Sequence, residues 1–306
     1  MGWFLLALLG PFLYAITNYL DKLVLERYVR GGSVATVLIF SGVFSGLSLP
    51  LLWLADPTVL RVSETHLAAL AGVGVLNFLV LLFYLKAIQG DEVSTAIIFY
   101  QLVPVLAYGL GYAFLGETLT ARQLVAMALI VLGTSVVSFS IDDGGFTFRG
   151  RTVLYMLAAS FCWALGAVLF KAVALEEQVV RSLFWENLTL AMIGAGIVTA
   201  SGRLRDQFLG VLRSNAGAVL SLNAVNESAY IAANVAMAFA YLLAPVSLVL
   251  LANSYQAVFV MVIGACISHF RPALLAATMR RGHLLQKVLA IAITALGTYE
   301  LLSSGR

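Results

Sequence analysis

The chain has 306 residues, of which 61% are hydrophobic and only 11% are charged, and its mean hydropathy is +0.98. Soluble globular domains contain about 25% charged residues, so this composition excludes a soluble protein and predicts an integral membrane protein. The formal net charge of +3 gives no reason to expect a nucleic-acid partner.

Apolar stretches of about 20 residues, the length that spans a bilayer as a helix, recur from one end of the chain to the other. Glycine, proline and charged residues separate them. The first stretch lacks the basic start and the cleavage pattern of a secretory signal, so we expect it to be retained. The predicted spans are residues 3–21, 33–54, 66–87, 93–115, 121–140, 152–172, 182–200, 215–241, 246–268 and 286–303. We therefore expect an all-α integral membrane protein with ten transmembrane helices.

Polar side chains interrupt the first four spans. Residues three, four or seven positions apart lie on one face of a helix, which places Tyr14 and Asn18 together with Asp21. Polar groups within a bilayer face the protein interior, and tyrosine and amide groups there suit a small amine or zwitterion. Interfacial anchoring of tyrosines is the alternative. The candidate cavity residues of the first half are Tyr14, Asn18, Asn77, Tyr84, Tyr100 and Gln101.

The middle of the chain contains its longest polar stretch, IDDGGFTFRGR at residues 141–151. We predict that this stretch is a linker between a first five-helix repeat, residues 1–140, and a second, residues 152–306. Short motifs recur in the two parts: FLYA at 12–15 and FCWA at 161–164, each followed by a lysine at the same spacing, and LGT at 132–134 and 296–298. Because each half has an odd number of spans, homologous halves would lie in opposite orientations. Inverted repeats of this kind are typical of transporters that bind substrate near the midplane, between the repeats.

The second half contains further polar residues within its spans. In the seventh span, Glu186 lies beside Asn187, and in the ninth, Asn253 and Gln256 share a face. The eighth span is the most polar, with a stripe at helical spacing whose carboxyl, Glu227, lies about midway along it. An unpaired charge at that depth costs at least a few kcal/mol, so we expect Glu227 to line a wet cavity or to hold a proton. The stripe consists of Asn223, Asn226, Glu227, Tyr230 and Asn234.

Two readings of this stripe stay open at the level of sequence. Asparagines also hydrogen-bond helices together within membranes, and for Asn223 and Asn234 this interpretation is as good as a role in a cavity.

Lys22 and Lys171 extend to the interface or neutralise carboxylates such as Asp21. Glu117, next to a turn before the fifth span, is expected to stabilise the amino end of that helix.

Several motifs together resemble the EamA-type transporters of the drug/metabolite transporter superfamily. They are the aromatic FYLKA at 83–87, Pro104 in the fourth span and LGETLTARQLVAMALIVLGTSVVS at 115–138. The resemblance covers nearly the whole chain but is weaker in the second half, where residues 269–285 replace the expected Gly-Glu. It implies a ten-helix fold with helices 1–4 and 6–9 around a central cavity, helices 5 and 10 at the side, and secondary transport of small metabolites.

The sequence therefore predicts a secondary active transporter of a small polar metabolite, such as an amino acid or amine, that works by alternating access with proton coupling or exchange. A flippase or transporter of a lipid-linked or amphipathic substrate is the alternative. An enzyme is not expected, because His66, His269 and His283 lie near span ends and form no H-E-x-x-H motif. Without a phosphate-binding loop, we expect no cofactor and no direct ATP drive.

The expected setting is the inner membrane of a prokaryote, with the protein a monomer or weak dimer. Lysines and arginines gather in the segments on the side opposite the termini, and by the positive-inside rule this favours an external location of both termini.

Overall fold

The computed structural model describes residues 2–24, 34–89, 98–138, 150–270 and 284–303. Within these residues the chain is helical and contains no strand. The α-helices are α1 (Gly2–Leu23), α2 (Val34–Ser45), α3 (Leu49–Ala55), α4 (Glu64–Ile88), α6 (Val103–Leu115), α7 (Ala121–Ser138), α8 (Gly150–Ala174), α9 (Val179–Ala200), α10 (Gly202–Leu243), α11 (Val246–Ala252), α12 (Gln256–Phe270) and α13 (Leu284–Ser303). Short 3₁₀ turns connect some of these helices. The turn η2 (Gly46–Ser48) joins α2 to α3, η3 (Ile98–Leu102) precedes α6, and η4 (Asn253–Tyr255) joins α11 to α12.

The helices are long and apolar enough for an integral multi-pass membrane protein. Seven segments of the described chain meet the length and hydropathy of a membrane span, and α10 adds an eighth if its two arms, bent by 107°, are one span. Two more apolar helices, Ala121–Val136 and Leu289–Ser303, are shorter. Each predicted span overlaps a described helix, although a complete ten-span arrangement stays a prediction.

The predicted linker needs one correction. Residues 141–149 lie outside the described residues, and Gly150 and Arg151 are the first two residues of α8 rather than part of a linker. Residues 93–97 of the predicted fourth span and residues 271–283 of the polar segment near the end also lie outside them.

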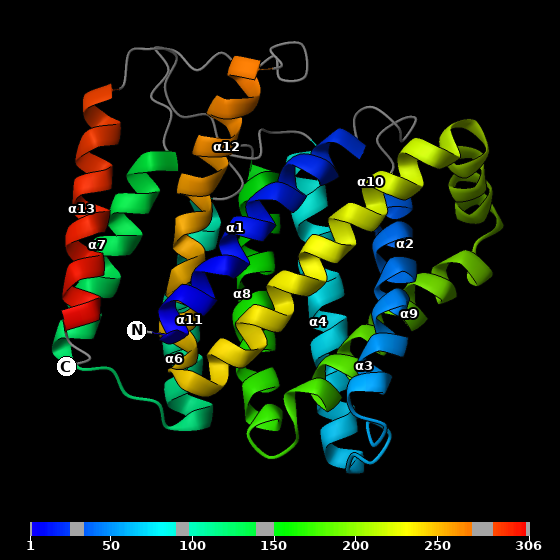
Figure 1. Ribbon diagram of the computed structural model, residues 1–306, viewed down its shortest axis with the longest axis horizontal. Helices are drawn as coiled ribbons and strands as arrows, with labels where there is room; N and C mark the ends of the chain where they lie inside the picture. Colours follow the sequence, from blue (N-terminus) through cyan, green and yellow to red (C-terminus); the bar gives the residue numbers. More distant parts are fainter. Residues whose placement is uncertain (1, 25–33, 90–97, 139–149, 271–283, 304–306) are drawn as a thin grey trace.

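The helices form a bundle with one pair at its side (Figure 1). The helices α7 and α13 lie against each other at that side, and the other helices form the body of the bundle. In the body, α1 crosses α10, α4 packs along α8, α2 along α9 and α6 along both α8 and α11. Segments far apart in sequence therefore meet throughout the core, and most helix pairs join one half of the chain to the other.

Glycines allow the closest helix contacts, because two helices approach nearer where a side chain is missing. At the α2–α9 crossing, a Cβ added at Gly42 would lie 2.8 Å from the Cα of Gly194. At the α7–α13 crossing, a Cβ at Gly133 would lie 2.9 Å from the carbonyl oxygen of Ala290, and one at Gly297 would lie 3.0 Å from that of Ala126.

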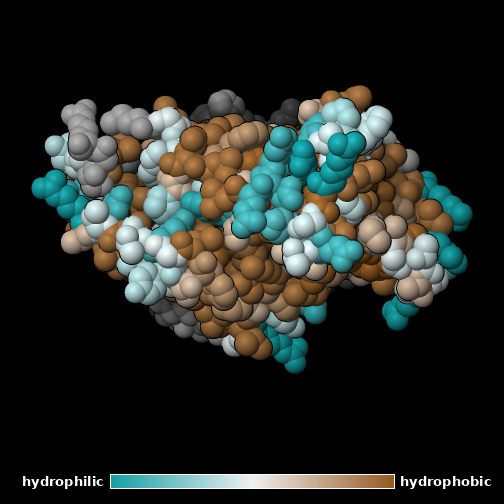
Figure 2. Space-filling view, turned by 90° about the horizontal axis from the view of Figure 1, so that it is seen from below, coloured by the Kyte–Doolittle hydropathy of each residue, from teal (hydrophilic) through white to brown (hydrophobic). Residues whose placement is uncertain are grey.

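One end of the bundle is tied together by polar contacts of the α3–α4 connection. Arg181 of α9 donates from Nε to Asp56 Oδ2 at 2.9 Å and from Nη2 to the Thr58 hydroxyl at 2.8 Å. Glu177, in the turn before α9, faces His66 Nδ1 at 3.0 Å. The hydrogen bond from the Thr58 hydroxyl holds the pKa of Asp56 below its usual value, and the bond from His66 lowers the pKa of Glu177. Figure 2, seen from this end, shows polar side chains among mainly hydrophobic ones.

A second ion pair at the same end lies where α10 stops and α11 begins. Lys171 Nζ, in the last turn of α8, lies 2.6 Å from Glu117 Oε1 and donates to the carbonyl oxygen of Ala244 at 2.8 Å. Glu117 Oε2 accepts from the backbone N–H of Val246 at 2.8 Å. The lysine thus neutralises the negative end of α10, and the glutamate the positive end of α11. Glu117 therefore stabilises the start of α11, whereas the sequence pointed to the start of the helix that directly follows it.

Candidate functional site

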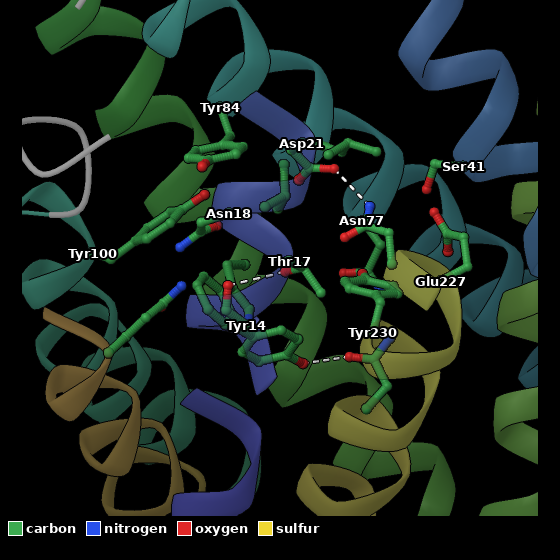
Figure 3. A pocket seen from close by; sticks show the side chains of 16 residues that line it. Tyr14, Thr17, Asn18, Asp21, Ser41, Asn77, Tyr84, Tyr100, Glu227 and Tyr230 are labelled. Carbon is green, nitrogen blue, oxygen red and sulfur yellow. Dashed lines mark hydrogen bonds between the residues drawn. The ribbon is translucent and has the colours of Figure 1, made fainter. Parts of the chain in front are cut away.

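A pocket lies within the body of the bundle, between α1, α2, α4, η3, α8, α10 and α12 (Figure 3). It contains about 690 Å³ of empty space, including its opening to solvent. Its lining residues are Tyr14, Thr17, Asn18, Asp21, Ser41, Asn77, Val80, Leu81, Tyr84, Tyr100, Trp163, Asn226, Glu227, Tyr230, Asn234 and Gln256. We call this cavity the central pocket.

Two buried carboxyl groups give the central pocket its acidic character. Asp21 of α1 is 7% exposed and Glu227 of α10 is 3% exposed. Asp21 Oδ1 accepts a hydrogen bond from Asn226 Nδ2 at 2.7 Å, and Ser41 of α2 faces the Glu227 carboxyl (Figure 3). Among the described residues that line the pocket, none is a lysine, arginine or histidine. In a membrane interior, carboxyl groups without a basic partner bind a proton or a cationic ligand.

Aromatic rings form much of the remaining wall. Trp163 of α8 packs edge-on against Tyr14, with ring centroids 5.7 Å apart, and against Tyr100 at 4.8 Å. Tyr84 stacks on Tyr100 at 6.1 Å, and Tyr230 lies 5.8 Å from Tyr14. Aromatic faces next to carboxyl groups attract organic cations through their negative quadrupole. Tyr14 and Trp163, equivalent positions of the repeated FLYA and FCWA motifs, meet in this wall.

Several buried polar atoms of residues that line the central pocket have no hydrogen-bond partner within the described part of the chain. They belong to five of its lining side chains and are each buried. These atoms are Asn18 Nδ2, Tyr84 Oη, Asn226 Oδ1, Glu227 Oε2 and Gln256 Oε1. A buried polar atom without a partner costs about 1–3 kcal/mol, so these donors and acceptors are available to a polar ligand.

A second pocket adjoins the first and shares Tyr14, Asn77, Trp163 and Asn234 with it. The Tyr14 hydroxyl donates to Asn234 Oδ1, and this contact lies where the two pockets meet. The described residues that line only the second pocket are Val73, Gly166, Ala167, Phe170, Leu183, Glu186, Met237, Ala238 and Tyr241. Glu186 Oε1 accepts a hydrogen bond from Asn77 Nδ2 at 2.6 Å.

The structure brings most of the predicted site residues to these pockets and leaves four away from both. Asn223 and Asn187 each donate to a carbonyl oxygen of their own helix, those of Val219 and Leu183, at 2.8 Å. Gln101 donates to the Ser254 carbonyl oxygen at 3.2 Å, and Asn253 is 2% exposed and lines neither pocket. The predicted residues that line a pocket are Tyr14, Asn18, Asn77, Tyr84, Tyr100, Glu186, Asn226, Glu227, Tyr230, Asn234 and Gln256.

The predicted set did not include several residues that line the central pocket. Asp21 carried a usable signal, because it shares a helix face with Tyr14 and Asn18. Trp163 carried another as the counterpart of Tyr14 in the repeated motif. Thr17 and Ser41 carried none, since single hydroxyl residues are common in membrane helices.

Comparisons with known proteins agree with this architecture. Residues 1–139 match the model of the EamA-like transporter family, whose members are transporters rather than enzymes. A search of curated proteins gave no match. One solved structure, described only as the crystal structure of a protein, is similar over 98% of this chain and 95% of that chain, with a TM-score of 0.63 and 15% identity, which is a similarity of fold alone. The match covers slightly less than half of the chain and supports a membrane transporter of the drug/metabolite transporter type.

Proposed function

We propose that the protein is a secondary active transporter that moves a small organic amine, or an amino acid presenting its ammonium group, across the membrane by alternating access. The central pocket is the proposed binding site. Asp21 and Glu227 take the ammonium group, the rings of Tyr14, Tyr100 and Trp163 surround it, and exchange for protons drives the cycle.

The observation that carries this proposal is the pairing of two buried carboxyl groups with aromatic walls in a pocket whose described lining residues include no basic side chain. A substrate with a phosphate or a second carboxylate would find no counter-charge there, because anions are held by arginine, lysine or helix amino ends. The same observation disfavours a flippase of a lipid-linked phosphate.

The contacts between helices support the proposed ten-helix arrangement of two inverted repeats, residues 1–140 and 152–306. If the five spans of the first half correspond in order to those of the second, α2–α9, α6–α11 and α7–α13 are pairs of equivalent helices. The α1–α10 pair likewise exchanges with the α4–α8 pair. These are extensive contacts of the bundle, as a two-fold axis between the repeats requires.

The α7–α13 contact supports the same arrangement at the level of single residues. The repeated LGT motifs place Gly133 against Ala290 and Thr294, and Gly297 against Ala126 and Ile130. The same difference in residue number separates Gly133 from Gly297, Ala126 from Ala290 and Ile130 from Thr294. The contacts of one helix are therefore repeated by the equivalent residues of the other, and the interface is self-complementary. The bent α10 and the two shorter apolar helices bring the candidate spans to the proposed number.

The experiment that tests this proposal is transport by the purified full chain in proteoliposomes under an imposed pH gradient. Phenethylamine serves as the aromatic amine probe, phenylalanine as the amino acid and phenyl phosphate as the anion. We expect uptake of phenethylamine, weaker or no uptake of phenylalanine, and none of the phosphate. Glu227→Gln and Asp21→Asn should lose uptake, whereas Glu64→Gln, which changes an exposed carboxyl at the start of α4, should keep it. Transport of the phosphate in preference to the amine would refute the proposal.

A further inference from the structure

The two adjoining pockets differ in whether their buried polar atoms have hydrogen-bond partners. Within the described part of the chain, five side chains of the central pocket have a buried polar atom without a partner, whereas none of the residues that line the second pocket has one. The central pocket therefore has hydrogen-bonding groups to offer an organic ligand. The second pocket has one acidic group among its described lining residues, Glu186.

Glu186 is buried in surroundings that favour its neutral form. Its side chain is 4% exposed on α9, and it accepts a hydrogen bond from an uncharged amide, Asn77 Nδ2, at 2.6 Å. Phe170, Met237 and Leu183 supply apolar walls around it. Within the described residues Glu186 has no ion pair, and an ionised carboxylate so placed costs several kcal/mol. A single proton removes that cost without any other ligand.

The groups that face Glu186 from the neighbouring helices are uncharged. Tyr14 on α1 and Tyr230 and Tyr241 on α10 are the titratable groups near it, and α4 contributes Asn77. The part of α8 that lines this pocket is apolar apart from Trp163. Tyrosines are neutral in the physiological range, so none of these groups supplies a positive charge.

We propose that Glu186 forms a proton-binding site in the second pocket, separate from the Asp21 and Glu227 site for substrate, and that its proton is the one exchanged during transport. Asn77 couples the two sites. Its amide lines both pockets and donates to Glu186, so a substrate that recruits this amide removes the hydrogen bond from Glu186 and changes its affinity for a proton. By linkage, the proton changes substrate affinity by the same factor.

The proton site is tested without any substrate, by infrared spectroscopy of the full chain in lipid. A protonated carboxyl group has a C=O stretching band that an ionised one lacks. We expect the wild type to show such a band at neutral pH and Glu186→Gln to lose its Glu186 component, with Glu64→Gln as the unchanged control. Asn77→Ser should shift the band without removing it, which provides a second variant if Glu186→Gln does not fold. An undiminished band in Glu186→Gln, or an unshifted one in Asn77→Ser, would overturn the assignment.

The coupling role rests on the proposed transport function and needs a second measurement, phenethylamine accumulation driven by a pH gradient. One exchanged proton supports about a tenfold concentration ratio per unit of gradient. Glu186→Gln should lose this accumulation and make counterflow of labelled phenethylamine independent of pH, and Glu186→Asp should restore both effects. Gradient-driven accumulation that persists in Glu186→Gln would place the exchanged proton elsewhere. If the wild type does not transport phenethylamine, the proposed substrate class fails, while the infrared band still decides whether Glu186 holds a proton.

Discussion

Replacing Lys171 by methionine should destabilise the protein more than any comparable change at a surface lysine. In the native structure Nζ contacts Glu117 Oε1 at 2.6 Å and the Ala244 carbonyl oxygen at 2.8 Å, and the two side chains of the ion pair are only 10% and 13% exposed. The variant leaves Glu117 as a nearly buried charge without a counter-ion. Breaking a buried pair in this way costs about 3–5 kcal/mol, and the residual exposure of both groups favours the lower end, about 3 kcal/mol.

A double-mutant cycle separates this effect from the loss of side-chain packing. Lys171→Met with Glu117→Leu removes both charges and leaves only the Ala244 carbonyl and the Val246 N–H unpaired, at about 1 kcal/mol each. The double variant should therefore be more stable than Lys171→Met alone. The free energy of unfolding, measured by circular dichroism during titration of detergent-solubilised protein with denaturing detergent, provides the readout.

Lys86 is the matched control for this experiment. It occupies the last turn of α4 as Lys171 occupies the last turn of α8, but it is exposed and lies 5.5 Å from the centroid of the Tyr155 ring. Lys86→Met should cost no more than about 1 kcal/mol, the size of an exposed cation–π contact. The reasoning is refuted if Lys171→Met costs no more than Lys86→Met, or if the costs of Lys171→Met and Glu117→Leu simply add.

Three further predictions follow from the packing, the charges and the pocket. Gly194→Leu should lower the free energy of unfolding by about 1–3 kcal/mol through overpacking, because a Cβ at this position would lie 2.9 Å from Gly42. Gly196→Leu is the control: a Cβ there meets nothing within 4 Å, so the free energy of unfolding should change by less than about 0.5 kcal/mol. Asp56 and Glu177 have lowered pKa values in the folded state, so they stabilise it above their unfolded pKa of roughly 4 and lose that contribution as the pH falls through the folded pKa values. Asp56→Asn should therefore reduce the loss of folding stability between neutral pH and about pH 3. An unchanged dependence of stability on pH in this variant would contradict the reasoning. Trp163→Ala should weaken phenethylamine binding roughly tenfold, equivalent to about 1.4 kcal/mol of cation–π attraction, whereas Trp53→Ala, at a side chain that is 49% exposed, should leave the dissociation constant measured by calorimetry unchanged.

Much of the fold could be predicted from the sequence because each helix has a local signal. Apolar length set most helix ranges to within a few residues, and Pro245 lies at the break between α10 and α11. The start of α10 was predicted wrongly: the span was expected at 215–241, but the helix begins at Gly202, because its polar first arm is helical without being apolar. The partner of Glu117 could not be predicted, because its contacts with Lys171 and Val246 join three segments that are distant in sequence. Only packing of the whole bundle brings these groups together.

The candidate site was predictable to the extent that helical spacing reveals a polar face. Asn226, Glu227, Tyr230 and Asn234 fall on one side of α10 and line the central pocket. Asn223 has the same spacing but donates to its own helix, at the Val219 carbonyl oxygen. Asparagines one helical turn apart can thus point to different environments, and the bend of α10 adds a change of direction that the spacing does not encode.

The contact between Tyr14 and Trp163 has a consequence for the choice of ligand. Under the proposed repeat, Tyr14 and Trp163 occupy equivalent positions of the two halves. A dimer of two identical chains would have the same side chain at both of these positions, one on each side of its two-fold axis. A single fused chain is free of that constraint, and here one side has a phenol that donates to Asn234 and the other an indole. A molecule whose two ends differ would therefore have one preferred way round in the pocket, and its reversed pose would meet the wrong wall.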